Sequence, residues 1–128
     1  MIMLSPFELL LLALAGAAGA CMRYGVDRLV NQLWPAPWPI GTWLVNLSGA
    51  ALAGWLAGNL FTGALDPAAA MVLSAGFAGS YTTFSGWMVQ TLMLLQREQY
   101  SAAAGNVVVH LVPGYVLCIM AYRLAVGY

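Results

Sequence analysis

The chain has 128 residues, 62% of them hydrophobic and 6% charged, and its four basic residues balance its four acidic ones. Soluble domains carry about a quarter charged residues, so this composition excludes an ordinary water-soluble protein. Zero net charge also gives no reason to expect nucleic acid as a partner. The sequence predicts an integral protein of the lipid bilayer.

Long uncharged stretches follow one another along the chain, at 29–65, 67–96 and 99–122. A membrane-spanning helix needs about 20 largely apolar residues, and each stretch is long enough for one. An earlier apolar segment, 7–22, is shorter, but charged side chains near both of its ends can reach the lipid headgroups. We therefore expect an all-α membrane protein with four transmembrane helices.

In chain order, the first helix starts at Pro6, a residue suited to a first helical turn. Three prolines within 34–39 exclude a helix there, and the two tryptophans of that segment suit the membrane interface. An Asp-Pro turn precedes the third helix, and a short polar connection precedes the fourth. In a single domain, we expect helices at about 6–30, 40–61, 68–96 and 101–125.

Small residues recur every four positions on two of these helices, as Ala50, Gly54 and Gly58 and as Gly16 and Ala20. This spacing lets helix backbones approach closely in lipid. Four thin helices enclose little interior, so we expect a homo-oligomer. The arginines show little bias between the two sides of the membrane, which permits insertion in both orientations.

The third helix contains a stretch, 76–86, in which glycines flank a run of hydroxyl-bearing residues. Glycine raises the cost of helix formation, and Ser and Thr side chains compete for backbone hydrogen bonds. We expect a break near mid-membrane, where half-helix N-termini favour anions and unwound carbonyls coordinate cations. The alternative is a bent but continuous helix whose hydroxyls bond to preceding carbonyls.

Asn46 is a polar residue within the second apolar segment. One interpretation is an interhelical hydrogen bond. The other is a pore-lining amide that donates an N–H to an anion.

Three motifs, in order and on the expected helices, resemble the Fluc-type (CrcB-like) fluoride channel family. Together they span most of the chain, which makes the resemblance far more specific than any one of them. They are Gly16-x-x-Gly19-Ala20-x-x-Arg23-Tyr24, Gly41-Thr42-x-x-Val45-Asn46, and Gly76-Phe77-Ala78-Gly79 followed by Thr82-Thr83-Phe84-Ser85.

The resemblance implies a fluoride-selective channel of the bacterial inner membrane that passively exports fluoride from the cytoplasm and relieves its toxicity. It implies an antiparallel, dual-topology dimer with two anion pathways. It also implies a central sodium ion (Na+) held by the backbone carbonyls of Gly79 and Thr82. A homodimer is expected, with a heterodimer of related chains as the alternative.

The resemblance also assigns roles within the pathway. Asn46 becomes the pore amide, and Phe84 presents its electropositive ring edge to fluoride. Arg23 is either a vestibule residue or an interfacial anchor. The expected fluoride pathway comprises Asn46, Thr83, Phe84, Ser85, Trp87, Asn106 and His110.

Two features depart from the family pattern. Trp87 stands where a second phenylalanine is usual, and Asn106, His110 and Gly114 stand where the fourth helix usually carries hydroxyls. His110 is either a packed core group or a ligand in the pathway. These changes are compatible with a half-functional or non-conducting subunit that needs a related partner chain.

No nucleophile–base pair is apparent, so we do not expect an enzyme. A small multidrug or guanidinium exporter is a further alternative with similar size and topology. That class needs a membrane-embedded carboxylate, and the only first-helix candidate, Glu8, lies near the end of its apolar stretch.

Overall fold

The computed structural model describes residues 4–128, and every regular element among them is a helix. Three helices are long and apolar enough to cross a membrane: α1 (Pro6–Leu33), α2 (Ile40–Phe61) and α6 (Tyr100–Val126). The expectation of an all-α, multi-pass membrane protein is confirmed at this level.

The start of α1 is fixed by a capping box. The Ser5 hydroxyl accepts a hydrogen bond from the Glu8 N–H at 3.3 Å, and the Glu8 carboxylate accepts one from the Ser5 N–H at 2.6 Å. Two of the N–H groups that a helix start leaves unpaired are thereby satisfied. The helix then runs to Leu33, three residues beyond the expected end, and stops just before the proline-rich segment.

The expected third helix is interrupted. Thr82 and Thr83 have extended backbone, with φ and ψ of −80° and 161° for the first and −145° and 111° for the second. The predicted break is therefore confirmed, and it lies within the stretch 76–86. The chain around it forms α3 (Pro67–Met71), the π-helix η1 (Val72–Ala78), α4 (Gly79–Tyr81) and α5 (Phe84–Gln96).

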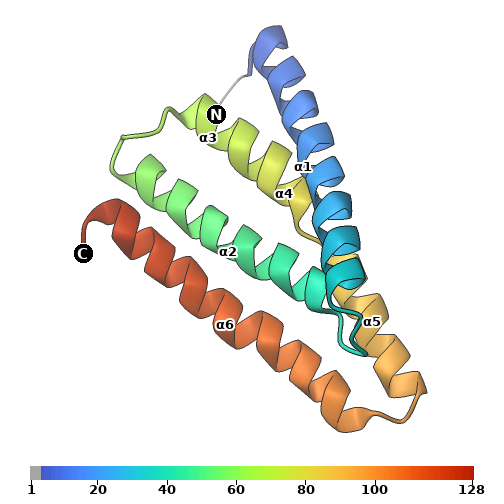
Figure 1. The fold of residues 1–128 in the computed structure, drawn as a ribbon. Coiled ribbons are helices and arrows are strands. Elements are labelled where there is room, and N and C mark those ends of the chain that lie inside the picture. The colour runs from blue at the N-terminus through green and yellow to red at the C-terminus, as the bar shows by residue number, and fades with distance from the viewer. Residues whose placement is uncertain (1–3) are drawn as a thin grey trace.

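Helices α2 and α6 lie side by side, and α1 packs against η1 and α4 (Figure 1). The α1–α2 and α5–α6 connections lie at one end of the bundle, and the α2–α3 connection lies at the other. Glycines permit these close contacts. A Cβ added at Gly54 would overlap the Cys118 carbonyl of α6, and one added at Gly19 would overlap the Phe77 carbonyl of η1. The small-residue spacing on α2 thus serves helix packing, as predicted.

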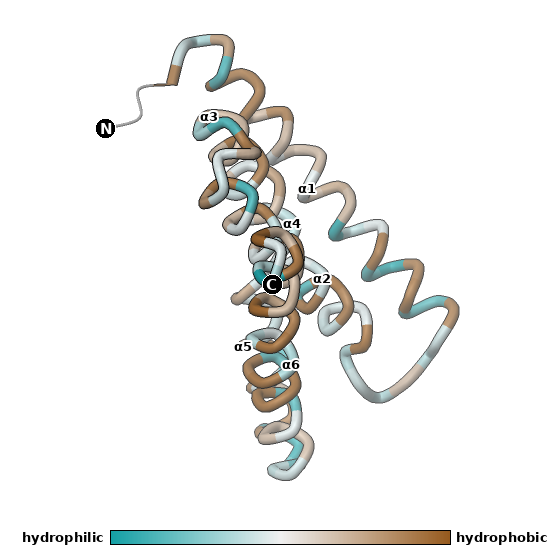
Figure 2. The backbone as a smooth tube through the Cα atoms, turned by 90° about the vertical axis from the view of Figure 1, so that its left-hand side faces the viewer, coloured by the Kyte–Doolittle hydropathy of each residue, from teal (hydrophilic) through white to brown (hydrophobic). Residues whose placement is uncertain are grey.

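Large apolar side chains face outward along most of the bundle. Leu14, Leu111 and Leu124 are each more than half exposed, and Figure 2 shows hydrophobic residues recurring along α1, α5 and α6. Few side chains lie in a core, because a thin helical layer encloses little volume. This distribution suits helices surrounded by lipid or by another protein surface.

Candidate functional site

The break between α4 and α5 is held by one side chain of α2. Asn46 Oδ1 accepts a hydrogen bond from the Thr83 N–H at 2.8 Å, and Asn46 Nδ2 donates one to the Thr83 carbonyl at 3.0 Å. Both backbone groups of an extended residue are thereby paired in a region that offers them no helical partner. The amide nitrogen carries two hydrogens, so one N–H of Asn46 remains available to another acceptor.

The threonine hydroxyls make hydrogen bonds at the end of the first half-helix and at the start of the second. Thr82 Oγ1 donates to the Ala78 carbonyl at 3.0 Å, and Thr83 Oγ1 accepts from the Gly86 N–H at 3.0 Å. Thr83 is therefore the N-cap of α5, a preferred role for threonine. Because a helix N-terminus carries a partial positive charge, the start of α5 at the break is favourable to anions.

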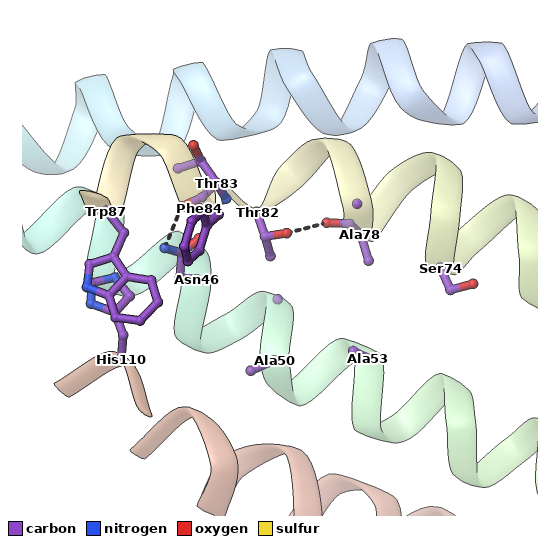
Figure 3. Close-up of a pocket in the computed structure, with 12 residues that line it drawn as sticks. Asn46, Ala50, Ala53, Ser74, Ala78, Thr82, Thr83, Phe84, Trp87 and His110 are labelled. Atoms are coloured by element: carbon purple, nitrogen blue, oxygen red, sulfur yellow. Dashed lines mark hydrogen bonds between the residues drawn. The ribbon is translucent and has the colours of Figure 1, made fainter. Parts of the chain in front are cut away.

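A cavity of about 440 Å³ adjoins the break (Figure 3). One part of its wall is polar and aromatic, and the rest is made of small residues such as Gly49, Ala50 and Ala53. Among the described residues, none that lines it bears a formal charge unless a histidine is protonated. The residues of the predicted pathway that line this cavity are Asn46, Thr83, Phe84, Trp87 and His110. Gly79 and Thr82 of the proposed cation site line it too.

Three rings lie in sequence at this cavity (Figure 3). The Phe84 and Trp87 rings meet edge to face, with centroids 5.5 Å apart at 90°. The Trp87 and His110 rings stack, with centroids 4.7 Å apart at 20°. Phe84 is 70% exposed, so its ring is free to meet an ion or a second subunit.

Asn106 and Ser85 lie outside this cavity, unlike the other predicted pathway residues. Asn106 is fully buried: its Oδ1 accepts from Trp43 Nε1 at 2.6 Å, and its Nδ2 donates to Thr91 Oγ1 at 2.8 Å. This amide joins α2, α5 and α6. Ser85 Oγ lies 3.3 Å from Thr83 Oγ1, beside the break.

Arg23 lines a second cavity of about 250 Å³ that also adjoins the break. Thr83 lines both cavities, so the two meet at the break. Sequence reasoning missed Gln90 and Asp27, which also line this second cavity. Gln90 lies four residues after Gly86 and seven after Thr83, a helical same-face spacing that could have revealed it.

The break changes the hydrogen bonding of the backbone carbonyls of Gly79 and Thr82. In a continuous helix the Thr83 N–H would be donated to the Gly79 carbonyl, but here it is donated to Asn46. Among the residues that the structure describes, the Thr82 carbonyl accepts only a long hydrogen bond, 3.4 Å, from Arg23 Nη1. Both oxygens therefore retain capacity to coordinate a cation.

The sequence matches, over residues 10–122, the family described as "CrcB-like protein, Camphor Resistance (CrcB)". It is 42% identical over 113 residues to the "Fluoride-specific ion channel FluC 2" of Mycolicibacterium paratuberculosis, covering 88% of this chain and 89% of the relative. The protein of the same name from Bacillus subtilis is 36% identical over 107 residues, covering 84% and 79%.

The family match includes every residue that lines the two cavities at the break, and these relatives align over most of their own chains. Together with the all-helical fold and the Asn46-held break, they assign the chain plainly: it belongs to the CrcB-like family.

Proposed function

We propose that this chain is the subunit of a fluoride-selective channel through which fluoride leaves the cytoplasm passively. The names of its relatives support the choice of ion. The observation that carries the proposal is the cavity at the break, which is lined by Asn46, Thr83 and Phe84 and shares Thr83 with a second cavity. We infer that these two cavities are parts of one anion path.

Fluoride is small and strongly hydrated, so a pathway must replace its water with many weak donors. The second N–H of Asn46, the N-terminus of α5 and the edge of the Phe84 ring are such donors. None of them is a fixed cation, so the ion is not held too tightly to leave. Neutral hydrogen fluoride enters from an acidic medium and dissociates in the cytoplasm, and the membrane potential then drives the anion out.

The assembly we propose is an antiparallel, dual-topology dimer in the bacterial inner membrane, each subunit having four spans. The segments from Pro67 to Gln96 would form the fourth span in series. The exposed Phe84 ring and the small residues Gly49, Ala50 and Ala53 give a second subunit room to approach this cavity. A homodimer is our first choice, and a heterodimer with a related chain is the alternative.

A sodium ion between the subunits fits the donors present. Gly79 and Thr82 would hold it, with two carbonyl oxygens from each chain, and oxygen atoms are the ligands that hard cations prefer. The ion would supply positive charge that offsets the cost of bringing an anion to membrane depth. The chain's own contribution is the break, which frees these oxygens from helical hydrogen bonds.

The decisive experiment measures fluoride efflux from liposomes that contain this chain alone, with a fluoride electrode and a chloride control. Fast fluoride efflux without chloride efflux is expected. Folded dimers that pass no fluoride would overturn self-sufficient conduction and favour the subunit that needs a related partner. The exporter alternative is less well supported, because the Glu8 carboxylate is occupied in capping α1.

A further inference from the structure

His110 has a fixed hydrogen-bonding pattern. Its Nδ1 lies 2.8 Å from the Asn106 carbonyl, which can only accept, so Nδ1 carries the hydrogen of this bond. In the neutral ring, Nε2 then bears a lone pair. His110 is only 8% exposed, and among the described residues its Nε2 has no hydrogen-bond partner. A buried polar atom left in this state calls for an explanation.

The indole of Trp87, next to His110, also has a ring nitrogen that is unpaired within residues 4–128. Trp87 Nε1 is also buried and has no partner among the described residues, and the Trp87 face covers the His110 ring. An indole face stabilises a cation above it, and the indole N–H is a donor. The pair therefore suits an imidazolium with an anion beside it. In the neutral ring, the Nε2 lone pair repels an anion.

Among the described residues, the helices packed against α6 bring no charged side chain to His110. Helix α6 packs against α2 and α5, and neither of these helices contains an Asp, Glu, Lys, Arg, Cys, Tyr or second His. On α6 itself the titratable residues nearest in sequence are Tyr115 and Cys118, five and eight positions away. A buried imidazolium without a counter-charge is costly. In an anion pathway, the permeating ion can supply that counter-charge.

We propose that His110 and Trp87 form a proton-dependent anion site in the pathway. Protonation at Nε2, by a proton taken from water, turns a repelling lone pair into an N–H donor and adds a positive charge. Fluoride then accepts from His110 Nε2–H and Trp87 Nε1–H, and the site empties when the proton leaves. This inference rests on the proposed function and makes fluoride passage through this chain stronger at acidic pH.

Because His110 is the chain's only histidine, nitrogen-15 NMR of imidazole-labelled protein reports on it alone. We expect the neutral ring to carry its hydrogen on Nδ1. We also expect sodium fluoride, but not sodium chloride, to keep the ring protonated to a higher pH. A titration that is the same in both salts overturns the site, and so does a neutral ring protonated on Nε2.

Fluoride efflux is then measured from about pH 5.5 to about 8, the range in which histidine titrates. Wild-type efflux should fall about tenfold or more across it, since hydrogen bonds to charged groups are strong. His110→Gln should remove the pH dependence. Tyr115→Phe, which deletes a 70% exposed titratable group of the same helix, should retain it.

The two proposals fail in different ways. Wild-type efflux that is fast and independent of pH overturns the His110 site and leaves the fluoride channel intact. Absent efflux at every pH, with the fluoride effect on the NMR titration preserved, overturns conduction by this chain alone and supports the anion site.

Discussion

Replacing Asn46 with alanine removes the two hydrogen bonds that hold Thr83 at the break. The Thr83 N–H and carbonyl are left without partners, and an unpaired buried backbone group costs about 1–3 kcal/mol. Water in the adjoining cavity can solvate part of this loss, so we expect the lower end, about 2 kcal/mol in total. Fluoride efflux should fall as well, because the free Asn46 N–H is lost.

A matched control lies on the same helix. Asn59 donates to the Trp55 carbonyl one turn earlier, at 2.8 Å and near the surface, so Asn59→Ala should change the free energy of unfolding by less than about 0.5 kcal/mol. Thermal unfolding in detergent and fluoride efflux from liposomes measure both variants. Equal losses for the two, or wild-type behaviour of Asn46→Ala, would refute the reasoning.

Three further predictions concern packing and passage. Trp43→Phe leaves the fully buried Asn106 Oδ1 without its donor and should cost about 1–3 kcal/mol in thermal unfolding, with efflux retained in folded protein. Gly54→Ala forces a Cβ against the α6 backbone and should lower the unfolding temperature, whereas Gly105→Ala meets nothing within 4 Å and should raise it. Phe84→Leu should reduce fluoride efflux by about tenfold with little change in unfolding, because the ring is exposed. Unchanged efflux in this last variant would remove Phe84 from the pathway.

Composition and local pattern alone determined the class of this protein and the existence of the break. Few charges and long apolar stretches require helices in lipid, because backbone groups there must pair within their own segment. The stretch 76–86 marked the interruption, since glycines and hydroxyls weaken a helix wherever they gather. Asn46 stood out because an amide in an apolar segment needs a partner.

The tertiary structure alone decided which partner each polar group has. Asn46 bonds to Thr83, 37 positions away, and Asn106 bonds to Trp43, 63 positions away. Helical spacing shows only that a side chain lies on a given face, and two amides on apolar helices look alike in sequence. Packing placed Asn46 at the cavity and buried Asn106 where α2, α5 and α6 meet. It also stacked His110 on Trp87, because α5 and α6 meet there, and left His110 Nε2 and Trp87 Nε1 without a hydrogen-bond partner among the described residues.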